Sequence, residues 1–82
     1  MLDISKRVFL APSCLKDQKT LDRLLKILEE HKVPKNKIIR GIDMDIISSG
    51  DYLIRCLGEE IQLFKIQFTL PFGYTTDLLL NL

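Results

Sequence analysis

The chain has 82 residues, of which 46% are hydrophobic and 28% are charged, and its formal net charge is +1. This apolar content excludes a disordered tail, and the length predicts a single domain, residues 1–82, with a small core. A net charge so close to zero disfavours a dedicated nucleic-acid-binding domain, because phosphate contacts require a large positive excess. So much apolar surface on so small a body predicts that a partner or a second copy covers part of it.

Only two cysteines occur, Cys14 and Cys56, which is too few for the disulfide framework of a small secreted protein. Cys56 is predicted to face inward from a strand as a small hydrophobe. Cys14 is predicted in a loop before a helix, where it is either an indifferent thiol or a thiolate stabilised by the helix N-terminus. No apolar run approaches the roughly 18 residues that span a bilayer, and the first residues lack the apolar segment of a signal peptide. We therefore expect a cytoplasmic protein that has no membrane partner.

The first predicted elements are a short strand over residues 6–11, which Pro12 ends, and a helix. The helix has Asp17 or Thr20 as its N-cap, runs to about Lys32 and is stopped by a proline. Its apolar residues recur at the spacing that places them on one buried face of a helix: Leu21, Leu24, Leu25, Ile27 and Leu28.

Three strands are predicted to follow, over residues 38–47, 52–57 and 60–70. Gly58 and Glu59 fit a two-residue hairpin loop, in which glycine in first place suits a type II′ turn. That loop sets Cys56 opposite Ile61, so that apolar residues meet apolar residues, and a slip by one residue would turn every side chain to the other face. These strands are therefore predicted to form a three-stranded antiparallel meander with one apolar face.

Beyond the meander, the chain carries an apolar C-terminal tail. The strand over residues 60–70 changes phase at Phe64 and Lys65, which predicts a β-bulge there. Pro71 ends that strand, and residues 75–77 are predicted to cap a short final helix that carries the last leucines. The predicted fold class is α+β, with a strand and a helix followed by the meander and the tail. The first strand is expected to lie beside one member of the meander.

The predicted core combines the buried face of the helix with the apolar face of the meander. Because one face of such a sheet is solvated, the intervening polar residues are expected on the outside. The core is predicted to contain Phe9, Leu21, Leu24, Leu28, Ile42, Met44, Ile46, Ile54, Cys56, Ile61, Leu63, Ile66 and Phe68.

Charge is distributed unevenly, with a net +5 over residues 1–40 and a net −4 over residues 41–82. Four basic residues are spaced by three or four positions and are predicted to line one face of the helix: Lys16, Lys19, Arg23 and Lys26. Such a face would dock on phosphates or on an acidic protein surface, or it is the solvated back of an amphipathic helix. The opposite charges also allow the basic helix of one copy to meet the acidic turns of another. The acidic side consists of Asp43, Asp45, Asp51, Glu59 and Glu60.

No pattern of catalytic or cofactor-binding residues is specific enough to predict an enzyme. Asp43 and Asp45 share one face of their predicted strand, with Glu60 two strands away. The Glu-x-Lys spacing of nuclease metal sites is absent, because Gln62 stands in the lysine position. His31 is the only histidine, and local spacing places no serine or cysteine beside it. We therefore expect no catalytic residue, no metal and no cofactor.

Two short resemblances to known families bear on the fold. The order of a helix, three strands and a closing helix over residues 16–82 resembles a double-stranded-RNA-binding domain, although residues 75–78 lack the lysine cluster that opens that family's second helix. The segment Lys6-Arg7-Val8-Phe9-Leu10-Ala11-Pro12-Ser13 and the helix after it resemble the first strand–helix unit of TIR-type domains. Ser49-Gly50-Asp51 is similar to their second loop. This second resemblance implies a fragment of an α/β domain in which residues 52–61 are helical.

The sequence thus predicts a small cytosolic interaction or regulatory protein that binds another protein and self-associates as a homo-oligomer. The strand over residues 60–70 is the candidate sheet edge, and Leu78 and Leu80 are the candidate contacts in the tail. The alternative is a nucleic-acid-binding module that uses the basic helix face, and a second alternative is the TIR-like fragment.

Overall fold

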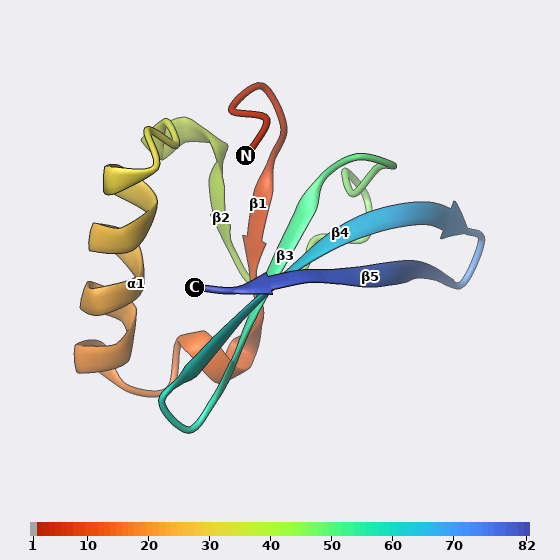
Figure 1. The fold of residues 1–82 in the computed structure, drawn as a ribbon. Helices are drawn as coiled ribbons and strands as arrows, with labels where there is room; N and C mark the ends of the chain where they lie inside the picture. Colours follow the sequence, from red (N-terminus) through yellow and green to blue (C-terminus); the bar gives the residue numbers. More distant parts are fainter. Residues whose placement is uncertain (1) are drawn as a thin grey trace.

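The computed structural model describes residues 2–82 as one α-helix packed on a five-stranded mixed sheet with the strand order β2-β1-β3-β4-β5 (Figure 1). The α+β class predicted from the sequence is confirmed, but the sheet is larger than the predicted meander and is mixed in direction. The elements in chain order are β1 (Val8–Leu10), η1 (Pro12–Cys14), α1 (Gln18–Glu30), η2 (Lys35–Lys37), β2 (Ile38–Arg40), β3 (Tyr52–Leu57), β4 (Glu60–Leu70) and β5 (Gly73–Asn81).

β1 occupies the centre of the parallel part of the sheet. Val8 pairs with Ile38 of β2 on one side and with Tyr52 of β3 on the other, and both pairings are parallel. Parallel neighbours need a crossover connection, and α1 supplies it between β1 and β2. The first strand therefore lies beside β3, a member of the predicted meander, as expected from the sequence.

α1 begins where the sequence predicts a cap. The carboxylate of Asp17 accepts a hydrogen bond from the hydroxyl of Thr20 at 3.0 Å and one from the backbone N–H of Lys19 at 3.2 Å. Both bonds favour the charged carboxylate, so the bond from Thr20 and then that from Lys19 lower the pKa of Asp17. The apolar face of α1 is buried against the sheet, as its spacing predicts.

The β3–β4 hairpin has the predicted register. Cys56 pairs with Ile61 and Ile54 pairs with Leu63, so apolar residues face one another across the two strands. Gly58 has a φ of +59, whereas the next residue does not enter the positive-φ region. This is the backbone pattern of the predicted type II′ turn.

The predicted strand over residues 38–47 is wrong beyond Arg40. β2 ends there because Gly41 has a φ of +95 and donates its N–H to a carbonyl of β1 at 2.8 Å. The next residues turn instead of pairing, since the carboxylate of Asp43 accepts the N–H of Asp45 at 3.0 Å. β2 is also parallel to β1, so it does not belong to an antiparallel meander.

The predicted C-terminal helix is also wrong, because the tail forms β5, which is antiparallel to β4. Tyr74, Thr75 and Thr76 are residue types of high β-propensity, and β4 offers them a row of backbone groups with which to pair. The antiparallel part of the sheet is therefore β3-β4-β5, one strand further along the chain than predicted.

The predicted bulge at Phe64 and Lys65 is wrong. Both residues pair with β3 in an unbroken register, and the irregularities lie in the pairing of β4 with β5, between Leu63 and Phe64 and between Ile66 and Phe68. Without a bulge at Phe64, regular alternation carries Ile66 to the face opposite Leu63. Phe68 is not a core residue, since it is 66% exposed.

The core is divided between the two faces of the sheet. The larger cluster lies between α1 and the sheet, and its fully buried members include Leu10, Leu24, Leu28, Ile54 and Leu63. The smaller cluster lies on the opposite face and comprises Phe9, Ala11, Ile47, Leu53 and Ile66. Of the predicted core residues, Met44 and Ile46 are exposed and Ile42 is half-buried, because the segment after β2 is a loop and not an inward-facing strand.

Each resemblance implies a helix after α1 that is absent from residues 2–82. Residues 52–61 form β3, the hairpin loop and the start of β4, where the TIR resemblance implies a helix. The closing helix of the double-stranded-RNA-binding order is the strand β5. Strand pairing with β4 accounts for both differences, since β4 pairs with β3 on one side and with β5 on the other.

Candidate interaction surface

The two C-terminal strands extend past the rest of the sheet. The last pair between β3 and β4 is Tyr52 with Lys65, and two further backbone hydrogen bonds of 2.8 Å join Ile66 to the loop before β3. Nearer its end, β4 pairs with β5 alone, as far as Leu70 with Gly73. Figure 1 shows β4 and β5 curving away together from α1 toward a shared turn. We call residues 68–75 of this two-stranded ribbon the arm.

The arm exposes its large apolar side chains. Phe68 is 66% exposed, Leu70 is 56% exposed, and Phe72, in the turn, is fully exposed. A hairpin of two strands is only marginally stable by itself in water. Adjoining exposed apolar side chains are also typical of surfaces that bind another protein. The arm therefore has the properties of a segment that packs against a partner.

The outer edge of β5 is free. Within residues 2–82 nothing pairs with it, because β5 is the last strand of the sheet. Leu78, Leu79 and Leu80 lie on this strand, and each is about half exposed. β5 has no lysine and no proline, the residues that often block pairing at natural sheet edges. Its sole charge, Asp77, accepts a hydrogen bond from Gln67 Nε2 at 2.7 Å. This edge can therefore accept another strand.

The structure joins two features that the sequence predicts separately, the sheet edge and the tail. The predicted edge, residues 60–70, is interior because β5 covers its outer side. Leu78 and Leu80, the predicted contacts, lie on the true edge strand. Sequence reasoning places Phe68 in the core and does not single out Phe72. One signal in the sequence could have predicted this hairpin. Pro71 and Phe72 form a two-residue gap between the strand-forming residues 60–70 and 73–81, which is typical of a hairpin.

The four basic residues predicted to line one helix face are all exposed but do not form one free surface. Lys16 precedes the N-cap of α1, and Lys19, Arg23 and Lys26 lie within the helix. The guanidinium of Arg23 donates a hydrogen bond to the carbonyl of Glu59 at 2.8 Å, which ties α1 to the β3–β4 hairpin. Lys19 and Arg23 share a hollow of about 510 Å³ beside that hairpin, whereas Lys26 lines a different hollow.

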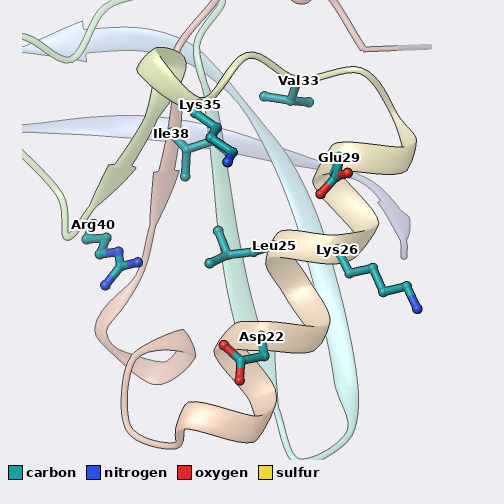
Figure 2. Close-up of a pocket in the computed structure, with 8 residues that line it drawn as sticks. All are labelled: Asp22, Leu25, Lys26, Glu29, Val33, Lys35, Ile38 and Arg40. Atoms are coloured by element: carbon teal, nitrogen blue, oxygen red, sulfur yellow. The ribbon is translucent and has the colours of Figure 1, made fainter.

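This second hollow, of about 460 Å³, lies between α1 and the edge strand β2 (Figure 2). Figure 2 shows Leu25 pointing from α1 across the gap, while Lys26 points away from it. The lining combines apolar, basic and acidic side chains, including Ile38, Arg40 and Glu29. The first hollow likewise contains Asp17 and Glu59 beside its basic groups. Neither hollow therefore offers the unbroken positive surface that phosphate binding uses.

One member of the predicted acidic side lies inside the molecule. Asp51 is only 2% exposed, and its carboxylate accepts hydrogen bonds from the backbone N–H groups of Arg7 at 3.1 Å and Ser48 at 3.0 Å. The guanidinium of Arg7 lies 3.6 Å from the same carboxylate. Asp51 therefore fastens the loop before β3 to the start of β1. Among residues 2–82, no three side chains of the metal-ligating types gather in one place.

No helix in the described part of the chain has the length and apolar content needed to cross a membrane. Comparisons with protein-family models, with curated proteins and with solved structures find no match to this chain.

Proposed function

We propose that this protein is a small cytosolic interaction module that pairs with a second copy of itself through β5. The observation that supports the proposal is the free outer edge of β5, a strand that carries three half-exposed leucines. An edge strand satisfies its free N–H and C=O groups by adding a strand. Burial of the leucines on β5 adds the apolar contact that drives association.

A two-fold pairing of β5 with itself has a favourable register. Antiparallel pairing about Leu79, the residue that the β4–β5 register skips, sets Leu78 opposite Leu80 of the second copy and Asp77 opposite Asn81. Apolar residues then meet, and the two Asp77 carboxylates stay apart. A register centred on Asp77 would bring like charges together, which is unfavourable. This self-complementarity favours a second copy over an unrelated strand.

The expected affinity is moderate. Burying the exposed half of one leucine contributes about 1 kcal/mol, so three leucines from each copy supply about 6 kcal/mol. Association itself costs about 4 kcal/mol or more in lost translation and rotation. The leucines alone would therefore pair the copies weakly, and the backbone hydrogen bonds between the two β5 strands are needed to bring the dissociation constant into the micromolar range.

The test is the oligomeric state of wild type, Leu78→Asp and the matched control Leu57→Asp, measured by sedimentation across the micromolar range. Leu57 is 54% exposed and Leu78 is 52% exposed, but Leu57 ends β3, two strands away from β5. We expect wild type and the control to dimerise. Leu78→Asp should stay monomeric with an unchanged circular dichroism spectrum, because pairing would bury an unpartnered charge.

Two results would contradict the proposal. One is a wild-type protein that stays monomeric at every concentration. The other is a Leu78→Asp protein that dimerises as tightly as wild type, which would place the interface away from β5.

A further inference from the structure

The two cysteines of the chain lie in contact. Cys14 ends η1 and Cys56 lies near the end of β3, 42 residues further along, yet their Sγ atoms are 2.8 Å apart. Both thiols are free and buried, with Cys14 fully enclosed and Cys56 7% exposed. The sequence predicts a small inward-facing hydrophobe at Cys56 and a loop thiol at Cys14, and only the fold brings the two together.

Backbone contacts hold the pair in place. The N–H of Cys56 donates a hydrogen bond to the hydroxyl of Ser13 at 3.0 Å, and the N–H of Ala11 donates to the carbonyl of Ile54 at 2.9 Å. These bonds fix η1 along β3 on both sides of the two sulfurs. A disulfide has an S–S length of about 2.05 Å, so the sulfurs need to approach by less than roughly 1 Å.

We propose that Cys14 and Cys56 are an oxidation site that converts reversibly between a dithiol and an intramolecular disulfide, with a hydroperoxide as the oxidant. In the first step, Cys56 Sγ attacks one oxygen of hydrogen peroxide and the O–O bond breaks. Cys56 becomes a sulfenic acid, and the departing hydroxide takes the thiol proton and leaves as water.

In the second step, Cys14 Sγ attacks Cys56 Sγ and the S–O bond breaks. The displaced hydroxide takes the proton of Cys14 and leaves as a second water. The two thiols have then lost two electrons, which reduce the peroxide to two waters. A dithiol reductant reverses the reaction by thiol–disulfide exchange.

The surroundings of the two thiols set the order of the steps. Cys56 reacts first because it is the more exposed of the two residues, and hydrogen peroxide is a small oxidant. Burial, followed by the hydrogen bond to Cys56, raises the pKa of Cys14 to about 12, which keeps Cys14 in the unreactive thiol form. Cys14 acts second, when the activated sulfur of Cys56 is already in contact with it and no diffusion is needed.

The disulfide would tie the loop before α1 to β3. Closing a chain segment of about 40 residues stabilises a fold mainly by restricting the unfolded chain. We expect the Tm of the oxidised protein to exceed that of the reduced protein by on the order of 10 °C.

The test is treatment of the purified wild-type protein with hydrogen peroxide, followed by unfolding, alkylation of the remaining thiols and mass spectrometry. We expect a monomeric chain lighter by two hydrogen atoms, with neither cysteine alkylated and one cross-linked peptide that joins Cys14 to Cys56. Dithiothreitol should restore both thiols. The same treatment in denaturant is the control for the oxidant, because the thiols of the unfolded chain are exposed and should be oxidised under these conditions.

The Cys14→Ala variant isolates the first step, since a sulfenic acid at Cys56 should persist in it and be trapped by dimedone. The proposal is overturned if both thiols of native wild type remain alkylatable under conditions that oxidise the unfolded chain. It is also overturned if oxidation yields only cross-links between chains or lowers the Tm. These decisive measurements use wild type, so they stand even if Cys14→Ala fails to fold.

Discussion

Asp51 lies directly before β3, and both oxygens of its carboxylate accept hydrogen bonds. Oδ1 accepts the N–H of Arg7, and Oδ2 accepts both the N–H and the hydroxyl of Ser48. The backbone carbonyl of Asp51 accepts the N–H of Ile66 at 2.8 Å, so this residue links the start of β1, the preceding loop and β4. The local pattern of serines, glycine and aspartate predicts only a turn, because Arg7 lies 44 residues away in the sequence.

Replacing Asp51 with alanine should lower the free energy of unfolding by about 3 kcal/mol, because the N–H groups of Arg7 and Ser48 lose their acceptors in a buried site. Asp45→Ala is the matched control, since Asp45 is exposed, and it should change the free energy by less than about 0.5 kcal/mol. Urea denaturation of both variants measures the difference. If Asp51→Ala and Asp45→Ala lower the free energy of unfolding equally, Asp51 does not anchor the loop before β3.

The raised pKa of Cys14 predicts that the folded protein loses stability at high pH. Burial raises its pKa from an ordinary 9.0 to about 12 in the folded protein, so between these values the unfolded chain releases a proton that the folded chain retains. The free energy of unfolding should therefore fall as the pH rises from 9 to 12. Cys14→Ala lacks this group and should lose less stability over that range. Thermal denaturation of wild type and Cys14→Ala under reducing conditions measures the difference. If both proteins lose the same stability between pH 9 and pH 12, Cys14 is not the group responsible.

Among the elements, α1 and the β3–β4 hairpin follow from signals that lie within them. A capping aspartate and an apolar period of helical spacing define α1, and Gly58 defines the hairpin turn and hence the register. Whether residues 73–81 form a strand or a helix depends on contacts with residues distant in the sequence. Three consecutive leucines fit a helix or a strand, and the free side of β4 decides between them. Leu78 and Leu80 could thus be predicted as contacts from their apolar character, but their place on a sheet edge could not.

The same dependence on strand partners explains why the alternation along β4 does not by itself predict that Phe68 is exposed. Its exposure depends on where the alternation along β4 is interrupted, and that interruption lies in the pairing with β5, near Gln67. A strand whose partner is unknown gives no indication of which residue the bulge leaves unpaired. The predicted bulge at Phe64 put Phe68 on the same face as Leu63 and so assigned an exposed side chain to the core.

The Gly58→Ala variant tests the turn between β3 and β4. Gly58 has a φ of +59, and a Cβ there meets no described atom within 4 Å, so the cost of alanine is backbone strain alone, about 1 kcal/mol. Gly73→Ala is the control, because Gly73 also has open space around it but lacks a positive φ. Chemical denaturation should show a lower free energy of unfolding for Gly58→Ala and little change in it for Gly73→Ala. The type II′ turn would be ruled out by a Gly58→Ala protein as stable as wild type.

The whole molecule is a compact body from which one hairpin extends. Its radius of gyration is 11.8 Å, close to the roughly 12 Å expected for a folded chain of this length. The two sheet edges differ: β2 has three residues and lies beside the basic groups of Lys35 and Arg40, whereas β5 has nine residues and three half-exposed leucines. A short edge flanked by charge resists pairing, and a long apolar edge favours it. Pairing between copies is therefore expected at β5 and not at β2.

Residue-resolved hydrogen exchange of the β5 amides, measured at low and high protein concentration, tests this pairing most directly. We predict that the β5 amides facing away from β4 exchange more slowly at high concentration and regain their fast exchange on dilution, because a second copy then accepts their hydrogen bonds. Amides at the edge of β2 should exchange at the same rate throughout. Exchange at the outer edge of β5 that is equally fast at every concentration would contradict the pairing of two copies through this strand.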